Sequence, residues 1–400
     1  MADVCIIGAG ASGLCAAIKL KQLSPQLSVA LLERFDRAGK KIAVTGNGRC
    51  NLSNESISLE NYHGADPDFA YPILKDFDVD ALKCFLEPLG VLIKKSENGK
   101  LFPYSLQASS VADALRFETE RLGVELLTNC EVQDIKKTNG GFSVFANERI
   151  FCRAVIIACG GMAGGKLGSD SGYRLLKSLG HGVTELSPAI VQIKTDTAFT
   201  KQLKGVKTDA LVKAPNGKQL LGEVLFCDYG LSGPPVLQLS RYLKKGDTIS
   251  LDIMPEYDLR ELSYMLNNRA KALKGIGNAE FFCGMLQKRL GQVVLKKCGF
   301  SINNRVDFND KDCKKIASVI KNLSFEYFGT TGFANAQVTH GGARTDEFSK
   351  HTYMSKKQKG LFACGEVLDI DGDCGGYNLH FAFGSGIAAA KGCAEYLGCK

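Results

Sequence analysis

The first 34 residues constrain the fold of this chain more than any other stretch. Residues 3–7 form a short apolar run, residues 8–13 read Gly-Ala-Gly-Ala-Ser-Gly, and residues 14–23 place apolar side chains at helical spacing. A second apolar run, residues 28–32, ends at Glu33. Short apolar runs of this kind suit buried parallel strands. The order therefore predicts a strand, a glycine-rich turn, a helix and a second strand, which is the βαβ unit typical of dinucleotide-binding domains.

Each part of this unit has a physical role in binding a dinucleotide. Gly8 permits the tight turn, Gly10 lets the backbone approach a pyrophosphate, and Gly13 lets the helix pack closely on the strand. Glu33 stands where an acidic side chain accepts a hydrogen bond from a ribose hydroxyl. An ordinary βαβ unit would explain the glycines but would leave Glu33 unexplained. We therefore favour dinucleotide binding.

The composition limits the class of protein. A chain of 400 residues is long enough for two or three domains, and contents of 45% hydrophobic and 23% charged residues are ordinary for a globular protein. The chain begins Met-Ala-Asp and runs directly into the first predicted strand, so we expect no signal peptide. No apolar run approaches the length needed to span a bilayer, so we expect no membrane span and a cytoplasmic location. The 15 cysteines include no C-x-x-C pair, so we expect reduced thiols and no metal site.

The formal net charge of +8 raises the question of an anionic partner. Many lysines occur as separate pairs spread along the chain, such as Lys94-Lys95, Lys244-Lys245 and Lys356-Lys357. Scattered pairs usually form a solvated surface, so the sequence makes a nucleic-acid partner unlikely. We expect a small-molecule substrate, and the sequence leaves the oligomeric state open.

The rest of the chain alternates between apolar runs, turns and helical patterns. Residues 34–51 are basic and rich in glycine, residues 131–152 resemble an antiparallel meander, and residues 154–161 return as a buried strand ending in glycines. We divide the chain into a first part of the dinucleotide-binding domain, a β-rich insert, a helical insert, return strands of the β-rich insert, and a second part of the dinucleotide-binding domain. Their bounds are 1–185, 186–256, 257–323, 324–345 and 346–400.

The closing segment gives the second strong signal. Residues 360–366 form a short apolar strand that ends Gly365-Glu366, and a helix is predicted from about Asn378 to Tyr396. A meander, a strand ending in glycines and a late strand of this kind resemble FAD-dependent oxidoreductases of the glutathione reductase type. Their late strand ends Gly-Asp, so Glu366 is a departure from that pattern.

Five stretches together resemble the BaiN-type NAD(P)/FAD-dependent oxidoreductase family: residues 4–13, 45–54, 228–234, 338–342 and 364–379. They extend from one end of the chain to the other. The resemblance implies an α/β fold, with a Rossmann-like FAD-binding domain of the glutathione reductase type and inserted β-barrel-like and helical domains. Thr45, Asn47 and residues 343–347 depart from the family's usual pattern, and these departures bear on the substrate.

The resemblance also implies a set of FAD contacts, drawn from the first turn, the second glycine-rich loop, the meander and the closing segment. These residues are Gly8, Gly10, Ala11, Ser12, Gly13, Glu33, Arg34, Lys41, Gly46, Gly48, Arg49, Cys50, Asn51, Val132, Gly160, Gly365, Glu366, Asp371, Gly376, Tyr377 and Asn378.

Three residues are candidates for catalysis. Cys50 lies in the loop expected near the flavin, His340 precedes two glycines, and Tyr229 lies in a loop that could cover the substrate. A packing cysteine, a histidine bound to backbone and a structural turn are the alternative interpretations. Because the chain has one full dinucleotide fingerprint, we expect NAD(P)H to dock transiently.

The main hypothesis is an FAD-dependent oxidoreductase that uses NAD(P)H to reduce an activated C=C bond in a small organic molecule, by hydride transfer through flavin N5. One alternative is a flavin oxidase of amines or alcohols that uses oxygen. A second alternative, suggested by the net charge, is an RNA-modifying or RNA-binding flavoprotein.

Overall fold

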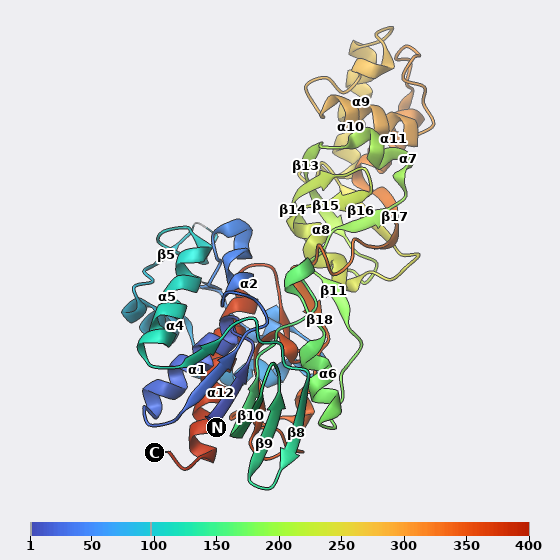
Figure 1. Cartoon of the computed structure of the whole chain (residues 1–400). Helices are drawn as coiled ribbons and strands as arrows, with labels where there is room; N and C mark the ends of the chain where they lie inside the picture. The colour runs from blue at the N-terminus through green and yellow to red at the C-terminus, as the bar shows by residue number, and fades with distance from the viewer. Residues whose placement is uncertain (1, 97, 400) are drawn as a thin grey trace. The chain divides into compact units, whose positions relative to one another are not determined.

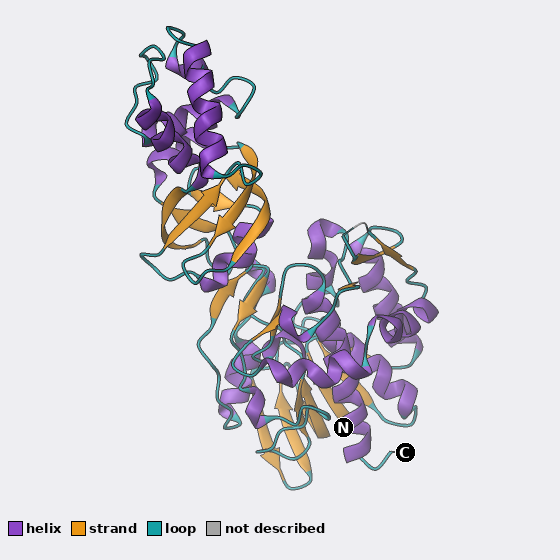
Figure 2. Cartoon of the chain, turned by 180° about the vertical axis from the view of Figure 1, so that it is seen from behind, coloured by secondary structure: helices purple, strands orange, loops and turns teal. Residues whose placement is uncertain are grey.

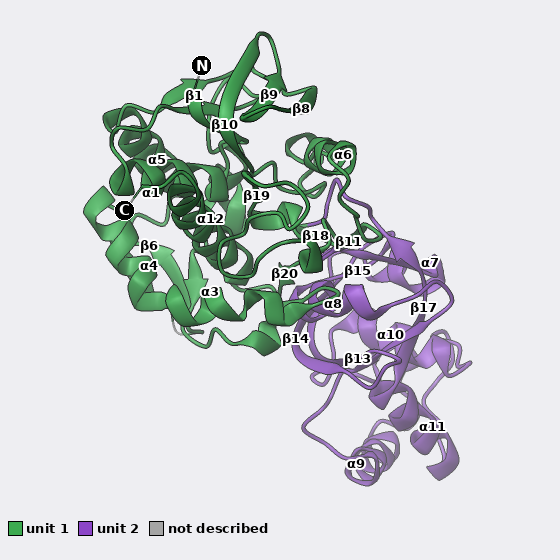
Figure 3. Cartoon of the chain, turned by 90° about the horizontal axis from the view of Figure 1, so that it is seen from below, with its two compact units in different colours: residues 1–188, 337–400 green, residues 189–336 purple. Residues whose placement is uncertain are grey.

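The computed structural model describes residues 2–96 and 98–399 and divides them into two compact units (Figures 1 and 3). Unit 1 contains residues 1–188 and 337–400, and unit 2 contains residues 189–336. The sequence-based division placed the return to the FAD domain at residue 346, whereas the compact unit resumes at Gln337. Among the described residues, no helix has both the length and the apolar character that crossing a bilayer requires.

The centre of unit 1 is a parallel sheet formed by segments from both ends of the chain. Its first strand, β1 (Ala2–Ile7), pairs in parallel with β2 (Val29–Leu32) and with β10 (Arg149–Ile157). Strand β7 (Glu125–Leu127) extends the sheet beyond β2, and β19 (Leu361–Ala363) pairs in parallel with the end of β10. All residues of β2 and β19 are buried, as expected for strands covered on both faces.

The predicted meander is present at one edge of this sheet. Strands β8 (Asp134–Thr138) and β9 (Gly141–Phe145) pair antiparallel, and β9 pairs antiparallel with the first part of β10. Strand β10 therefore belongs to the meander at its start and to the parallel sheet at its end. This arrangement confirms the predicted Rossmann-like architecture.

Two helices pack closely beside the central sheet. Helix α1 (Ala11–Leu23) follows the glycine-rich turn, and α12 (Tyr377–Tyr396) closes the chain. A Cβ atom at Gly386 would lie 2.2 Å from the carbonyl oxygen of Ser12, so this glycine lets α12 approach α1. The same unit contains further elements: α2 (Lys40–Ala43), β3 (Ser53–Asn54), β4 (Tyr62–His63), α3 (Tyr71–Asp76), α4 (Val79–Leu86), β5 (Ile93–Lys95), β6 (Lys100–Pro103), α5 (Ala108–Arg121), α6 (Ser171–Ser178), β18 (Val338–His340) and β20 (Asp371–Gly372). Strand β11 (Ser187–Ala189) pairs with β18.

Unit 2 is built around a closed six-stranded barrel, seen as the upper left group of orange strands in Figure 2. Its strands follow the order β12 (Ile193–Thr195), β15 (Gly230–Ser232), β14 (Gln219–Phe226), β13 (Lys207–Lys213), β16 (Thr248–Asp252) and β17 (Leu323–Thr330). The barrel agrees with the β-barrel-like insert that the family resemblance implied.

The helices of unit 2 share one hydrophobic core with the barrel. They are α7 (Thr197–Thr200), α8 (Pro234–Leu239), α9 (Leu259–Ala272), α10 (Lys288–Lys297) and α11 (Asp310–Lys321). Asp258 caps α9 and Asn309 caps α11 through capping boxes, which fixes where these helices begin. The core joins barrel residues such as Leu251 to helix residues such as Leu266 and Ile316. The β-rich and helical inserts therefore form a single compact unit.

Candidate active site

The three glycines of the first turn have different environments. A Cβ atom at Gly8 would lie 2.6 Å from the carbonyl oxygen of Ala158, and one at Gly13 would lie 1.9 Å from the carbonyl oxygen of Gly8. Gly8 also has φ +99°, a conformation that favours glycine. Gly10 has φ −85°, and a Cβ atom there would meet nothing within 4 Å. Gly8 and Gly13 are therefore required by the fold, whereas the space above Gly10 is open.

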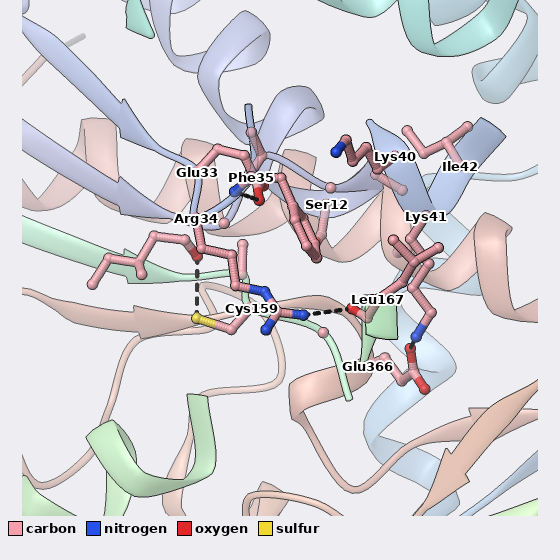
Figure 4. Close-up of a pocket in the computed structure, with 18 of the residues that line it drawn as sticks. Ser12, Glu33, Arg34, Phe35, Lys40, Lys41, Ile42, Cys159, Leu167 and Glu366 are labelled. Carbon is pink, nitrogen blue, oxygen red and sulfur yellow. Dashed lines mark hydrogen bonds and ion pairs between the residues drawn. The ribbon is translucent and has the colours of Figure 1, made fainter. Parts of the chain in front are cut away.

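This open space is part of a large cavity in unit 1 (Figure 4). The cavity contains about 1160 Å³ of empty space, including its mouth. It extends from the glycine-rich turn and Glu33, past Val132 and Gly160, to Glu366 and the start of α12. Eleven of the residues predicted to bind the cofactor line it: Gly8, Gly10, Ala11, Ser12, Glu33, Arg34, Lys41, Val132, Gly160, Glu366 and Asn378.

Glu33 is held rigidly at the edge of the turn. Its Oε2 atom accepts a hydrogen bond from the Ala9 N–H at 2.9 Å, and its Oε1 atom accepts one from the Phe35 N–H at 3.0 Å. Burial raises the pKa of Glu33, although both N–H donors oppose this effect. Each carboxylate oxygen has a second lone pair, so the side chain can also accept hydrogen bonds from ribose hydroxyl groups.

Arg34 organises the wall of the cavity. Its Nη2 atom donates to the carbonyl oxygens of Leu167 and Gly168 at 2.9 Å, and its guanidinium lies 4.4 Å from the centre of the Phe35 ring (Figure 4). These bonds connect the end of β2 to the loop after β10. No local pattern predicted Phe35 and Leu167 as lining residues, because their approach depends on this long-range contact.

At the other end of the cavity, Lys41 and Glu366 form an ion pair between segments far apart in the chain. Lys41 Nζ lies 2.7 Å from Glu366 Oε2, and Glu366 Oε1 accepts a hydrogen bond from the Thr339 N–H at 2.9 Å. Both side chains are mostly buried. Glu366 therefore links α2 to β18 while it lines the cavity. Gln337 and Val338 also line the cavity, and sequence reasoning missed both.

The second glycine-rich loop supplies one lining residue, Thr45. Gly46, Asn47, Gly48 and Cys50 have φ between +55° and +80°, so the loop is tightly coiled. The remaining predicted contacts do not line the cavity and stay predictions: Gly13, Gly46, Gly48, Arg49, Cys50, Asn51, Gly365, Asp371, Gly376 and Tyr377.

The side chain of Asn51 is suited to binding a ligand, whereas burial makes that of Cys50 poorly suited to redox chemistry. Asn51 Oδ1 is buried without a hydrogen-bond partner among the described residues, as expected for a polar atom that awaits a ligand. Cys50 is fully buried, and burial raises the pKa of its thiol to about 11. A thiol in this state is neutral near pH 7 and a weak nucleophile. The redox role of Cys50 stays a prediction that its burial does not favour.

His340 is two residues from Val338 on strand β18; Val338 lines the cavity, whereas His340 is not one of its lining residues. Its Nδ1 atom lies 2.6 Å from Oδ1 of Asp371, which is fully buried in β20. The carboxylate accepts the Nδ1 proton, so Nε2 is the ring atom suited to proton exchange. The His340 side chain is 37% exposed.

Tyr229 belongs to unit 2, in the turn between β14 and β15. Cys227 and Gly230 close this turn with a backbone hydrogen bond of 2.8 Å. Burial raises the pKa of the half-buried Tyr229 hydroxyl, so it is neutral at physiological pH. Its catalytic role stays a prediction.

The residues that surround the cavity fit an FAD molecule. The turn and the start of α1 offer backbone N–H groups to a pyrophosphate, and Glu33 offers carboxylate oxygens to a ribose. Asn378 at the start of α12 lines the opposite end, where the positive end of the helix dipole can face a flavin ring. Within the described ranges, no group of His, Cys, Asp and Glu side chains is arranged to hold a metal ion.

Comparisons with known proteins agree with this geometry. A family model described as the HI0933-like protein Rossmann domain matches residues 2–392. The chain is 38% identical over 403 residues to the 3-dehydro-bile acid delta(4,6)-reductase of Clostridium scindens, with 98% of each chain covered. It is 29% identical over 394 residues to the ribosomal RNA dihydrouridine synthase of Escherichia coli, with 97% of each chain covered.

Solved structures with similar folds are more distant. The 3-ketosteroid-delta4-(5alpha)-dehydrogenase of Rhodococcus jostii RHA1 gives a TM-score of 0.53 at 15% identity, covering 99% of this chain and 96% of that chain. The FrdA chain of the Escherichia coli quinol fumarate reductase gives 0.52 at 16% identity, covering 99% and 70%. At these identities the likeness shows the fold alone. The family model and the reductase relative confirm the resemblance seen in the sequence: the chain belongs to the HI0933-like family, and it is an FAD-dependent oxidoreductase.

Proposed function

We propose that the protein reduces a C=C bond conjugated with a carbonyl group in a small organic substrate and takes its electrons from NAD(P)H. The observation that carries this proposal is a cavity that fits FAD, with the His340–Asp371 pair on the strand whose residue Val338 lines that cavity. The relative at 38% identity, whose name describes reduction of a bile acid, supports a steroid-like enone as the first substrate class to test.

Reduction of a C=C bond requires a hydride on one carbon and a proton on the other. FAD bound in the cavity would supply the hydride chemistry. We assign the proton to the protonated imidazole of His340, which donates it from Nε2 and recovers a proton from solvent. In the net reaction the π bond breaks, two C–H bonds form, and NAD(P)H leaves as NAD(P)⁺.

Asp371 positions the imidazole for this step. It is fully buried, and its strand β20 pairs antiparallel with β4, with Asp371 opposite His63. The carboxylate therefore has little freedom to move, and its negative charge stabilises the positive imidazolium. Because Asp371 occupies Nδ1, proton transfer to the substrate is confined to Nε2.

NAD(P)H is proposed as a transient donor. The sequence contains one full dinucleotide fingerprint, and its turn lines the cavity assigned to FAD. A second nucleotide that docks only for hydride transfer needs no fingerprint of its own. Reduction of the flavin by NAD(P)H and reduction of the substrate by the flavin are then two half-reactions that can be measured independently.

The proposal is tested by following flavin absorbance without oxygen. NADH or NADPH should bleach the wild-type flavin, and a 3-oxo-Δ4-steroid should then restore its colour. His340→Asn should bleach at the wild-type rate but re-oxidise about 10² to 10⁴-fold more slowly, because it lacks the proton donor. The exposed residue His351 provides the control, and His351→Asn should behave as wild type.

Three results would contradict parts of this proposal. Wild-type re-oxidation by His340→Asn would remove His340 from the mechanism. Failure of both nucleotides to bleach the flavin would remove NAD(P)H as the direct donor. Bleaching by an amine or alcohol, followed by re-oxidation with oxygen, would favour an oxidase.

A second candidate substrate is a uracil base in ribosomal RNA. Ribosomal RNA dihydrouridine synthases of Escherichia coli and Haemophilus influenzae are 29% and 27% identical to this chain, and the net charge of +8 suits a polyanionic substrate. The C5=C6 bond of uracil is conjugated with the C4 carbonyl, so the same hydride and proton chemistry applies. Mass spectrometry of ribosomal RNA incubated with the reduced protein tests this candidate, since the product nucleotide gains two hydrogens.

A further inference from the structure

The net charge of the chain is confined to unit 2. Residues 189–336 contain 22 Lys and Arg against 14 Asp and Glu, which gives +8. Residues 1–188 and 337–400 together contain 28 of each, and their net charge is zero. A charge difference of this size between two units indicates that unit 2 is the part that meets an anionic partner.

Within unit 2, one helix carries only positive charges. Helix α10 contains Lys288, Arg289, Lys296 and Lys297 and no Asp or Glu. Arg289 and Lys296 are seven residues apart, so they lie on the same face two turns from each other. Lys297 differs, because burial lowers its pKa and its ammonium lies over the rings of Phe199 and Phe325.

The exposed face of α10 is joined to a second basic segment. Arg289 Nη1 donates to the carbonyl oxygen of Lys204 at 3.1 Å, and Lys296 Nζ donates to Gln202 Oε1 at 2.6 Å. These bonds place the exposed residues Lys201 and Lys204 beside the helix. We call the set Lys201, Lys204, Arg289 and Lys296 the basic strip.

Most of the basic strip is not neutralised by nearby carboxylates. Lys204 pairs with Asp228 at 2.6 Å. Within the part of the chain that the structure describes, Lys201, Arg289 and Lys296 make no ion pair with Asp or Glu. The surface of a protein without a charged partner usually mixes positive and negative side chains. A row of positive side chains on the surface therefore indicates an anionic partner.

From this strip we infer that unit 2 binds RNA through its phosphate backbone and that Lys201, Arg289 and Lys296 contact phosphates. This inference rests on the second candidate function. A row of cations along a helix matches a partner whose charges also lie in a row. Arg289 gives one guanidinium nitrogen to a backbone carbonyl, and its other N–H groups can bind a phosphate bidentately.

The inference makes unit 2 a docking module and unit 1 a catalytic module. RNA affinity should then depend on charges of unit 2, whereas flavin binding and reduction of a small enone should not. The two units can be probed separately because no residue of the basic strip lines the cavity.

The experiment measures binding of a fluorescent RNA hairpin of about 30 nucleotides with uridines in its loop, at several salt concentrations between about 50 and 200 mM. Wild-type holoprotein should bind, and the logarithm of its affinity should fall linearly with the logarithm of salt concentration. The variant Lys201→Gln/Arg289→Gln/Lys296→Gln should bind at least about tenfold more weakly at low salt. Its salt slope should be smaller by about 1 for each cation removed.

The control removes the same charge from unit 1. Lys75→Gln/Lys177→Gln/Lys350→Gln changes three exposed lysines, leaves the net charge equal to that of the strip variant, and should bind RNA as wild type does. Equal losses in both variants would overturn the inference in favour of net charge alone. Failure of wild type to bind the hairpin would also overturn it.

The outcome separates this inference from the proposed function. Both variants should keep the wild-type flavin spectrum and the wild-type rate of enone reduction. RNA binding through the strip without formation of dihydrouridine would reject the uracil substrate and retain the docking surface. Equal binding of a DNA hairpin would support backbone recognition, while stronger binding of heparin than of RNA would overturn RNA as the partner.

Discussion

Unit 1 and unit 2 differ in charge and in the range of the contacts that build them. Unit 1 has no net charge, and its cavity is formed by segments from both ends of the chain, such as Lys41 and Glu366. Unit 2 carries the net charge of +8 and is formed by one continuous stretch, residues 189–336. The comparison indicates that cofactor binding and the proposed RNA binding can be tested separately.

The largest expected effect distinguishes two glycines of unit 1. Gly13→Val should unfold unit 1, with a loss of more than about 4 kcal/mol, because its Cβ atom would lie 1.9 Å from the Gly8 carbonyl oxygen. Gly10→Val should change stability by less than about 1 kcal/mol yet bind FAD at least tenfold more weakly, because its side chain enters the open cavity. Urea unfolding and flavin retention measure the two effects. Normal flavin retention by Gly10→Val would show that FAD does not approach this turn.

The second prediction concerns the separate core of unit 2. Phe281 is fully buried and packs edge-to-face against Phe282 and Phe308. Phe281→Ala should destabilise unit 2 by about 3–5 kcal/mol. Thermal unfolding should then show an early transition in which FAD stays bound. In the matched variant Phe142→Ala, which alters the fully buried core of unit 1, FAD release should accompany the early transition. FAD release from both variants at one temperature would mean that the units unfold together.

The third prediction is an acid sensitivity that belongs to unit 1. His181 is buried, and its Nδ1 atom lies 2.9 Å from Glu347 Oε2. Burial lowers the pKa of His181. Burial also opposes the charge on Glu347, but the Lys357 ammonium and the Gly182 N–H outweigh it and hold the pKa of Glu347 below its usual value. Both groups bind fewer protons in the folded state, so stability should fall as the pH drops below about 6.5.

Glu347→Gln tests this network. The variant should lose about 1–2 kcal/mol at pH 7.5, because it loses hydrogen bonds to charged groups. The difference in free energy of unfolding between the variant and wild type should become smaller at acid pH, where Glu347 itself becomes protonated. Urea midpoints at several pH values measure both effects. Glu395→Gln, at an exposed position of α12, is the control. If Glu347→Gln and wild type differed in free energy of unfolding by the same amount at every pH, Glu347 would not be a source of the acid sensitivity.

The smallest expected effect concerns the ion pair at the cavity. Lys41→Gln should weaken FAD binding by about 1 kcal/mol, roughly fivefold, because Glu366 would keep its charge without the cation. Reconstitution of the apoprotein with FAD measures this, and the exposed Lys177→Gln is the control. Tighter FAD binding by Lys41→Gln would mean that the lysine does not offset a negative charge at the cofactor site.

The cofactor fold could be read from the sequence because its signals are local. The turn of residues 8–13, the acidic residue Glu33 and the final helix each depend on neighbours in the chain. The predicted helix from about Asn378 to Tyr396 is observed as Tyr377–Tyr396. Eleven predicted cofactor residues line one cavity, whereas the predicted loop at residues 46–51 lies outside its lining.

What the sequence determined by itself is therefore the class of fold, the family and eleven of the residues that line the cavity. Tertiary structure decided which of these residues meet. The Lys41–Glu366 and His340–Asp371 pairs join residues 325 and 31 positions apart, and no local pattern predicts such contacts. Structure also showed that the excess positive charge of the chain lies in unit 2, because the boundary of that unit is set by packing and not by composition.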